Sequence, residues 1–259
     1  MMTSELDSDA VQAKLHGRWG ATTAVLDVTA STMDDAAAAA SRGAPDGHLI
    51  VADRQESGRG AHGRAWESPP GTDLYFSVVA RPNLEPSSIA LVTLATGLGV
   101  RDAVASFVPD RTVEVKWPND VWIGRRKCAG VLVESRMTGP SIDWVIVGVG
   151  LNVNRLEWAP ELQSIATSIL QERGGDPLDR SEVLAAVVGQ VESWVGRLVA
   201  HGGGALIDAL RSHLALVGER VRWEDGEGTF EGVGPSGAAL VRTASGLETL
   251  HAARFETVD

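Results

Sequence analysis

A glycine-rich basic loop between two expected strands limits what this chain can fold into. The strands are expected at residues 49–52 and 74–80, and the loop covers residues 55–71. Its centre, Gly58-Arg59-Gly60-Ala61-His62-Gly63, matches the GxGxxG pattern of dinucleotide-binding folds. Those folds require a helix that opens at the loop and an acidic residue about 20 positions later. Here Pro69-Pro70-Gly71 blocks a helix and residues 76–84 contain no acid, so a dinucleotide-binding fold is disfavoured.

The loop concentrates cations in an acidic chain. Arg59, His62 and Arg64 alternate with glycines, whereas the whole chain has a net charge of −11. Glycines let backbone amides approach an anion, and arginines bind phosphate or carboxylate through two parallel hydrogen bonds. The loop therefore predicts an anionic ligand, and the alternative is a solvated, flexible loop.

The remaining patterns predict a mixed α+β protein with a second, smaller domain. Ser31 caps an alanine-rich helix that stops at Gly43. Further helices are expected at residues 87–107, 181–199 and 205–214, and a β-meander at residues 113–117, 121–123, 129–135 and 142–154. Short strands with turns after Leu216 are typical of a small barrel. We expect a loose tail over residues 1–20, a large domain over 21–214 and a small barrel over 215–259.

The strand over residues 147–154 has one face without bulk. Side chains alternate along a strand, so Gly148, Gly150, Asn152 and Asn154 face one way. Glycines inside a strand mark the close approach of a ligand or of another group. The pattern favours either a ligand or a large neighbour such as Trp117 or Trp144.

Two lysine motifs add cations to the expected site. Lys116 precedes a turn, Trp117-Pro118-Asn119-Asp120, and Lys127 lies in a hairpin after Arg125-Arg126. Each lysine alone fits a solvated turn, but their combination with the basic loop favours a role in ligand binding. Trp66, attached to the basic loop, is the tryptophan expected to line a ligand.

Composition excludes several classes of protein. Cys128 is the single cysteine, which rules out an internal disulfide and a multi-cysteine zinc site. The histidines have no metal-ligand spacing, and no serine or cysteine lies in a nucleophile elbow. The N-terminus lacks the pattern of a signal peptide, and no stretch is expected to span a membrane. We expect a cytoplasmic protein that binds neither membranes nor DNA.

Five motifs, in order, resemble the biotin–protein ligase family. They are Ser31-Thr32; Gln55 with Gly58-Arg59-Gly60-x-x-Gly63-Arg64-x-Trp66; Lys116-Trp117-Pro118-Asn119-Asp120; Arg126-Lys127-x-Ala129-Gly130-Val131-Leu132-Val133-Glu134; and Gly148-Val149-Gly150-Leu151-Asn152-Val153-Asn154. The resemblance covers residues 27–154. It implies a catalytic domain like the class II aminoacyl-tRNA synthetase core, with a mixed sheet, and a C-terminal SH3-like β-barrel.

The resemblance also implies an activity and a set of site residues. Biotin would be activated with ATP and Mg²⁺ to biotinyl-5′-AMP and then transferred to a lysine of a biotin carboxyl carrier protein domain of an acyl-CoA carboxylase. The catalytic residues would be Arg59, Lys116 and Lys127. Biotin would be bound by Ser31, Thr32, Met33, Gln55, Gly58, Arg59, Gly60, Lys127 and Gly130. ATP would be bound by Arg59, Gly60, Arg64, Trp66, Lys116, Asn119, Asp120 and Asn152, with Asp120 toward the magnesium ion.

The chain departs from the family pattern at two positions. Met33 stands where the family often has asparagine, and Ala61 where many members have arginine. The first puts a biotin contact in doubt, and the second predicts faster leakage of the intermediate. The capped helix at Ser31 begins too soon for a preceding helix-turn-helix, so we expect no DNA-binding domain, and we expect a monomer or weak homodimer. The alternatives are a lipoate–protein ligase and a non-catalytic biotin sensor or scaffold.

Overall fold

A seven-stranded mixed sheet forms the centre of the protein. The computed structural model describes residues 6–258, apart from the side chain of His62. The strand order is β1-β2-β3-β7-β6-β5-β4, with β1 and β2 parallel and every other pair antiparallel. The strands are β1 (Thr23–Thr29), β2 (His48–Gln55), β3 (Leu74–Ala80), β4 (Val113–Lys116), β5 (Asp120–Ile123), β6 (Arg126–Thr138) and β7 (Ser141–Leu151). The expected α+β class and the meander β4 to β7 are confirmed.

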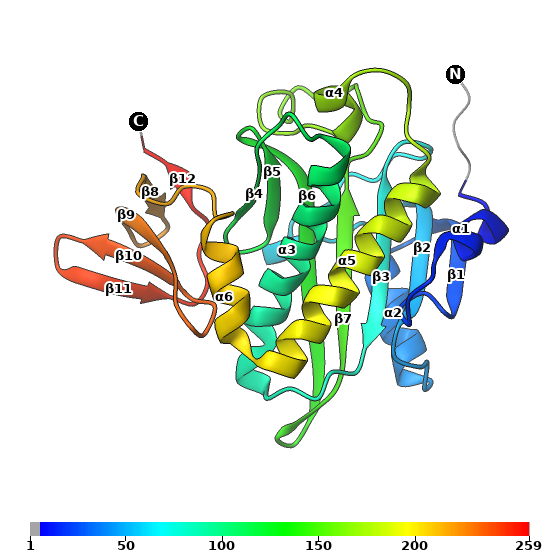
Figure 1. The fold of residues 1–259 in the computed structure, drawn as a ribbon, viewed down its shortest axis with the longest axis horizontal. Coiled ribbons are helices and arrows are strands. Elements are labelled where there is room, and N and C mark those ends of the chain that lie inside the picture. The colour runs from blue at the N-terminus through cyan, green and yellow to red at the C-terminus, as the bar shows by residue number, and fades with distance from the viewer. Residues whose placement is uncertain (1–5, 259) are drawn as a thin grey trace.

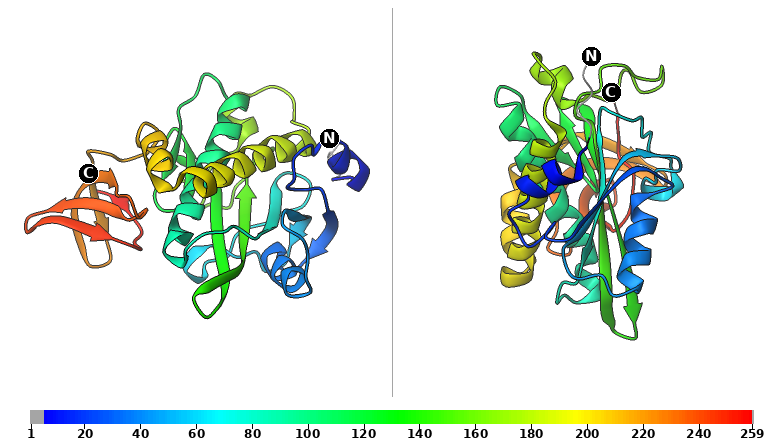
Figure 2. Two further views of the ribbon diagram at one scale, coloured as in Figure 1. Left: turned by 60° about the horizontal axis from the view of Figure 1, so that its bottom comes forward. Right: turned by 90° about the vertical axis from the view of Figure 1, so that its right-hand side faces the viewer.

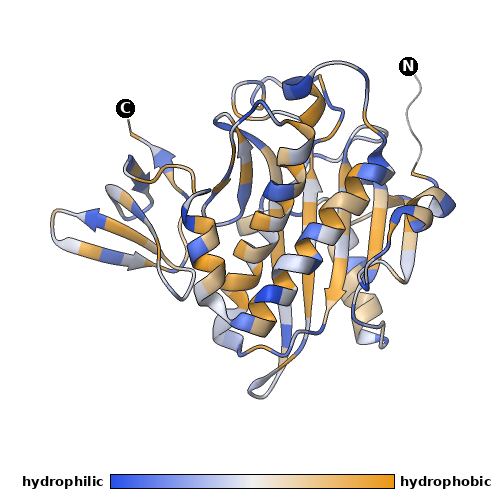
Figure 3. Ribbon diagram, in the orientation of Figure 1, coloured by the Kyte–Doolittle hydropathy of each residue, from blue (hydrophilic) through white to orange (hydrophobic). Residues whose placement is uncertain are grey.

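Helices cover both faces of this sheet (Figures 1 and 2). One face carries α3 (Ile89–Phe107) and α5 (Arg180–His201), which pack on each other, and the other carries α2 (Thr32–Ser41). Two short 3₁₀ helices, η1 (Ala61–Gly63) and η2 (Pro86–Ser88), and the helices α4 (Ile169–Arg173) and α6 (Gly203–Arg211) complete this part. The apolar colour concentrates on the central strands, whereas the helices carry both apolar and polar segments (Figure 3).

The alternation expected along β7 is confirmed. Val147, Val149 and Leu151 belong to the main core under α3 and α5, whereas Ile146 belongs to the small core under α2. Because side chains alternate with period two, Gly148 and Gly150 lie on the α2 face. This face therefore has open space next to the helix that Ser31 begins.

Two helices meet the length and hydropathy of a membrane span, which the sequence analysis did not anticipate. They are Pro86–Phe107 and Arg180–His201. Both lie on the sheet, where Leu94, Leu98, Val187 and Val191 are buried. Packing on the sheet accounts for the apolar residues of both helices, and α3 has the more continuous apolar surface because more of it is buried than of α5.

The N-terminal segment is wrongly predicted as a loose tail from residue 6 onward; residues 1–5 lie outside the described part. Helix α1 (Ser8–Lys14) begins at Asp7, whose side chain accepts a hydrogen bond from the Ala10 amide. Val11 and Trp19 are buried, and α1 packs on α5. Val11 is the one buried side chain of this short helix, and a single apolar position gives no recognisable helical pattern.

A smaller antiparallel sheet follows α6. Its order is β11-β10-β9-β8-β12, formed by β8 (Arg220–Trp223), β9 (Gly226–Val233), β10 (Ala239–Thr243), β11 (Gly246–Leu250) and β12 (Glu256–Thr257). It is joined to the main sheet through Trp117, whose indole Nε1 donates to the Gly237 carbonyl at 2.9 Å. The Trp117 ring also packs on Phe255, with centroids 5.1 Å apart.

A buried carboxyl group should make stability depend on pH. Asp73 is fully buried, and burial raises its pKa from 3.8 to about 6, although hydrogen bonds from the Val153 amide and the Tyr75 hydroxyl oppose this change. Its contribution to stability is fully present below pH 3.8 and is lost as pH rises through about 6. A change of this size corresponds to about 3 kcal/mol. Asp73→Asn should remove that fall, as measured by urea unfolding between pH 4.5 and 7.

The control for this prediction is an acid with the opposite behaviour. Burial would raise the pKa of Asp179, but hydrogen bonds from Lys14 and from the Ser181 amide outweigh burial and lower it. Its stabilisation is fully present above its ordinary pKa of 3.8 and is lost only as pH falls below that value, so Asp179→Asn should leave the slope between pH 4.5 and 7 unchanged. Parallel pH profiles for wild type and Asp73→Asn would contradict the expectation.

Candidate active site

A cavity of about 340 Å³ opens on the α2 side of the main sheet. It lies among the basic loop, the glycine face of β6 and β7, and the segment that follows β7. The lining contains these predicted site residues: Thr32, Met33, Gln55, Arg59, Gly60, Arg64, Trp66, Asn119, Lys127, Gly130 and Asn152. Residues far apart in the sequence are therefore brought together, while Ser31, Gly58, Lys116 and Asp120 lie outside this lining.

One end of the cavity is a network of uncharged polar groups. The backbone amide and the hydroxyl of Thr32 donate to Gln55 Oε1 at 3.0 and 3.2 Å. The Thr32 hydroxyl also lies 2.9 Å from Ser77 Oγ, and Gln55 Nε2 donates to Ser68 Oγ at 3.0 Å. The network holds side chains of α2, β2 and β3 in one orientation. Ser77 was missed because a serine inside a buried strand carries no local signal.

Ser31 and Gly58 lie next to this end of the cavity but do not line it. Ser31 begins α2 and is fully buried, and its hydroxyl has no hydrogen-bond partner among the described residues. A Cβ on Gly58 would come within 2.5 Å of the Trp66 carbonyl and 2.9 Å of Gln55 Nε2. Gly58 therefore allows the loop to pass close to Gln55, which is a backbone role in this state.

Met33 and Trp66 cover the glycine face of the sheet. A Cβ on Gly148 would lie 2.3 Å from Met33 Sδ, and one on Gly150 would lie 2.4 Å from Trp66 Cε2. A Cβ on Gly130 would meet the same indole at 2.8 Å. The bulky neighbours of this face are thus Met33 and Trp66, and the expectation of Trp117 or Trp144 is wrong. The Trp66 Nε1 group is buried and has no hydrogen-bond partner among the described residues.

Arg59 is held by two carboxylates at the edge of the cavity. Its Nη2 atom lies 3.0 Å from Asp34 Oδ1 and 2.9 Å from Glu134 Oε2. The Gly60 amide donates to the Arg64 carbonyl at 2.7 Å, and Arg64 Nε donates to the Ala61 carbonyl at 3.3 Å. In this state Arg59, the Gly60 amide and the Arg64 side chain all have partners within the protein, so an anion that bound them would have to displace those partners.

The two lysines lie in different environments. Lys127 Nζ is 2.6 Å from Asp120 Oδ1 and 5.0 Å from the centre of the Trp66 ring, inside the cavity. Lys116 is buried outside the lining, with its Nζ 5.3 Å from the centre of the Trp122 ring. Burial lowers the pKa of Lys116, and the Asp120 carboxylate opposes that change. Asp120 thus connects the two motifs electrostatically.

The two predicted asparagines make structural hydrogen bonds. Asn119 Nδ2 donates to the Val131 carbonyl at 2.7 Å. Asn152 Nδ2 donates to the Thr167 carbonyl at 2.9 Å and to the Lys127 carbonyl at 3.4 Å. Asn152 is buried, so its amide fixes the backbone around Lys127 in this state.

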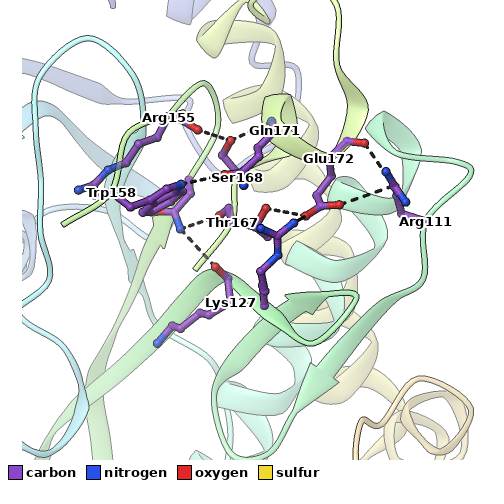
Figure 4. A network of polar contacts seen from close by, with 10 residues as sticks. Arg111, Lys127, Arg155, Trp158, Thr167, Ser168, Gln171 and Glu172 are labelled. Atoms are coloured by element: carbon purple, nitrogen blue, oxygen red, sulfur yellow. Dashed lines mark hydrogen bonds and ion pairs between the residues drawn. The ribbon is translucent and has the colours of Figure 1, made fainter. Parts of the chain in front are cut away.

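The wall formed by the segment after β7 was missed in the sequence. Arg155, Trp158, Glu161, Leu162, Ile165 and Ala166 line the cavity. The Arg155 guanidinium lies 4.6 Å from the centre of the Trp158 ring and pairs with Glu67 at the end of the basic loop. Trp158 Nε1 donates to Gln171 Oε1 at 2.8 Å (Figure 4). The available signal was an arginine three residues before a tryptophan in an irregular segment. This pair alone does not indicate a binding site.

The described residues contain no cluster of three or more His, Cys, Asp or Glu side chains able to hold a metal ion. A magnesium ion that enters with a nucleotide needs only one or two carboxylates, because phosphate oxygens and water complete its ligands. Asp120 fits that limited requirement, since its carboxylate lies beside Lys127 at the cavity.

Comparison with known proteins gives a consistent family. Residues 25–152 match the model of the biotin/lipoate A/B protein ligase family. The bifunctional ligase/repressor BirA of Bacillus spizizenii is 30% identical over 236 residues, covering 89% of this chain and 72% of the relative. The biotin–[acetyl-CoA-carboxylase] ligase of Mycobacterium tuberculosis is 34% identical over 229 residues, covering 85% of this chain and 81% of the relative.

Solved structures agree with the sequence relatives. The biotin protein ligase from Aquifex aeolicus in complex with biotin and ATP superposes with a TM-score of 0.77 at 29% identity, covering 91% of this chain and 97% of that one. The biotin protein ligase from Leishmania major in complex with biotinyl-5-AMP gives a TM-score of 0.61 at 25% identity, covering 89% of this chain and 99% of that one. Sequence, fold and cavity therefore place this chain in the biotin–protein ligase family.

Proposed function

We propose that this enzyme activates biotin with ATP to biotinyl-5′-AMP and transfers biotin to a lysine of a biotin carboxyl carrier protein domain of an acyl-CoA carboxylase. The observation that carries the proposal is the polarity of the cavity. Thr32 and Gln55 form an uncharged hydrogen-bonding end, and Lys127, Arg59 and Arg64 supply cations at the rest of the lining. This matches a ligand with a neutral polar ring and an anionic activated end.

The chemistry requires cations where two anions meet. A biotin carboxylate oxygen attacks the α-phosphorus of ATP, the bond to pyrophosphate breaks, and a mixed anhydride forms. Arg59 and Lys127 would offset the repulsion and fix the in-line geometry, with Lys116 contributing charge from behind the cavity. Mg²⁺ held by Asp120 and the phosphates would supply further neutralisation.

The same cations also assist the second step, the transfer of biotin to the acceptor lysine. The acceptor lysine, as the neutral amine, attacks the biotinyl carbonyl carbon, AMP leaves with the bonding electrons, and the new amide loses a proton. Lys127 would stabilise the developing charge on the carbonyl oxygen. Trp66 and the basic loop would keep water from the anhydride. Arg59 would exchange Asp34 and Glu134 for the ligand. We also expect the loop to be more mobile without ligand and to become ordered over it when ligand binds.

Several finer assignments belong to the same proposal. We assign residues 21–214 to a catalytic domain of the class II aminoacyl-tRNA synthetase type and residues 215–259 to an SH3-like barrel. The net charge of −11 disfavours binding to DNA and to anionic membranes. We further assign the enzyme to the cytoplasm and expect a monomer or weak homodimer. Biotin would be contacted by Ser31, Thr32, Met33, Gln55, Gly58, Gly60 and Gly130, and ATP by Arg64, Trp66, Asn119 and Asn152.

One assay tests the activity. The protein is mixed with Mg²⁺, ATP, a carrier domain and either biotin or lipoate, and the mass of the carrier is followed. A mass increase of one biotinyl group supports the proposal. No increase with biotin, or an increase with lipoate alone, would refute it, the second result indicating a lipoate–protein ligase.

Ala61 is expected to make the intermediate leak. Ala61 lines the cavity in the basic loop without a charged side chain. Ala61→Arg would add a cation near the acyl phosphate, and one charge-assisted hydrogen bond contributes about 1.5–3 kcal/mol. Release of biotinyl-5′-AMP should therefore slow by roughly ten-fold or more. A filter-binding chase with labelled intermediate measures this rate, and an unchanged rate would show that Ala61 does not control release.

A further inference from the structure

Lys127 lies at an interruption of the β5–β6 ladder. Val121 pairs with Ala129 and Trp122 pairs with Lys127, so Cys128 has no partner on β5. A β-bulge of this kind redirects the neighbouring side chain and leaves part of the backbone outside the ladder. The direction of the Lys127 side chain therefore depends on what holds its backbone from the other side.

The other side is held by the segment before α4. Lys127 N donates to the Ile165 carbonyl at 2.8 Å, and Thr167 N donates to the Lys127 carbonyl at 2.9 Å. These bonds make a parallel bridge between Lys127 and Ala166. Asn152 donates to the Lys127 and Thr167 carbonyls and ties the two strands of the bridge together. The bridge thus fixes both backbone polar groups of Lys127.

A single carboxylate fastens both sides of the bridge. Glu172 Oε1 accepts from Thr167 Oγ1 at 2.7 Å and also from Arg126 Nη2, and Glu172 Oε2 lies 3.6 Å from Arg111 Nε (Figure 4). Arg126 immediately precedes Lys127 in the chain, and Thr167 immediately follows Ala166, the bridge partner of Lys127. Glu172 therefore binds one residue next to each member of the bridge. The Glu172 side chain is only 8% exposed, so its charge is poorly screened by water.

We infer that Glu172 is a positioning residue for Lys127, acting through Arg126 and Thr167. The inference rests on the proposed role of Lys127 at the activated carbonyl. Glu172 does not line the cavity, so it acts only by holding the backbone from which Lys127 projects. Residues that hold a catalytic group in place can change activity by up to about 100-fold when removed. Their effect is large because a displacement of about 1 Å disrupts a geometry needed for catalysis.

The first experiment measures adenylation by the full-length enzyme. In a single-turnover assay of biotinyl-5′-AMP formation, Glu172→Gln should lower the rate constant by about ten-fold. The Kd for biotin, measured by calorimetry, should change by less than about two-fold, because Thr32 and Gln55 are untouched. Glu182→Gln, an exposed glutamate in the first turn of α5, is the matched control and should retain the wild-type rate.

A double-mutant cycle separates positioning from general damage. If Glu172 acts through Lys127, then adding Glu172→Gln to Lys127→Ala should lower the residual rate by less than about two-fold. Equal, multiplicative losses in both backgrounds would overturn the inference. Thr167→Val, which removes the hydroxyl donor and preserves shape, gives a second route, and it should reproduce the non-additive loss with a smaller effect.

The outcomes distinguish this inference from the proposed function. An active wild type with a fully active Glu172→Gln variant overturns the positioning role alone. A wild type that forms no biotinyl-5′-AMP overturns both. Recovery of the rate by Glu172→Asp, relative to Glu172→Gln at equal thermal stability, supports a requirement for the negative charge.

Discussion

Lys127→Ala is expected to reduce biotin transfer by roughly a hundred- to a thousand-fold, which is the usual cost of removing one group that stabilises charge in a transition state. Lys127 Nζ is 2.6 Å from Asp120 and lies in the cavity beside Trp66. The substitution removes the cation nearest the expected acyl phosphate. It also removes the ion-pair partner of the Asp120 carboxylate. Both adenylation and transfer should slow, as measured by pyrophosphate release and by carrier mass.

Two variants control this prediction. Lys127→Arg preserves the charge in a different shape and should lose less activity than alanine. Lys14→Ala removes a lysine of similar exposure, 34% against 28%, that pairs with Asp179 outside the cavity. It should remain fully active. Full activity of Lys127→Ala would remove this residue from the mechanism and leave the basic loop as the main source of catalysis.

Gly150→Ala is expected to reduce activity by about a hundred-fold, because a small displacement of a residue in the site has a large kinetic effect. A Cβ there would lie 2.4–2.8 Å from three atoms of the Trp66 indole, a rigid ring that has to move as a whole. The crowding should also cost about 1–3 kcal/mol of stability. Activity and thermal unfolding together measure the two effects.

The matched comparison lies on the same strand. Gly148→Ala would collide with Met33 Sδ, which is part of a flexible side chain that has other rotamers. Its effect on stability should therefore be smaller. Gly189→Ala in α5 has open space and should be neutral or stabilising, since alanine favours a helix by up to about 1 kcal/mol over glycine. Equal effects at Gly148 and Gly150 would show that the rigidity of Trp66 is not the cause.

The sequence predicted those parts of the fold that have local causes. Helix α2 starts after Ser31 and ends before Gly43, whose φ is +89°, as the sequence predicted, although the Ser31 hydroxyl makes no capping hydrogen bond among the described residues. The strand β3 follows from a nearly continuous apolar run, and β7 from side chains that alternate with period two, each with turn residues at its ends. Strand β1 was missed because it is an edge strand, half-buried along much of its length, and its partner β2 follows only after a helix. The residues of β1 therefore give no clear strand pattern by themselves, and the strand is recognised only from its pairing with β2.

The site shows the same division between local and long-range causes. The basic loop and the lysine motifs could be read from residue types, and the cavity contains most of them. The wall from Arg155 to Ala166 could not, because its residues reach the cavity through contacts with Glu67 and Gln171 rather than through a regular element. Asn152 looked like a ligand, yet its amide binds two backbone carbonyls. Buried amides commonly satisfy backbone groups, and sequence alone does not distinguish the two roles.

Trp117 has a consequence for how far the two parts of this protein are separable. Its side chain is 2% exposed, and its partners Gly237 and Phe255 lie beyond the expected domain boundary. The expected domain boundary lies near Leu214, but apolar side chains on the two sides of this boundary pack against each other. A truncation at the boundary would uncover an indole that stands next to Lys116, and a transplanted C-terminal unit would have to reproduce both contacts. The two units follow one another in the sequence, but each would lose the contacts of Trp117 if it were separated from the other.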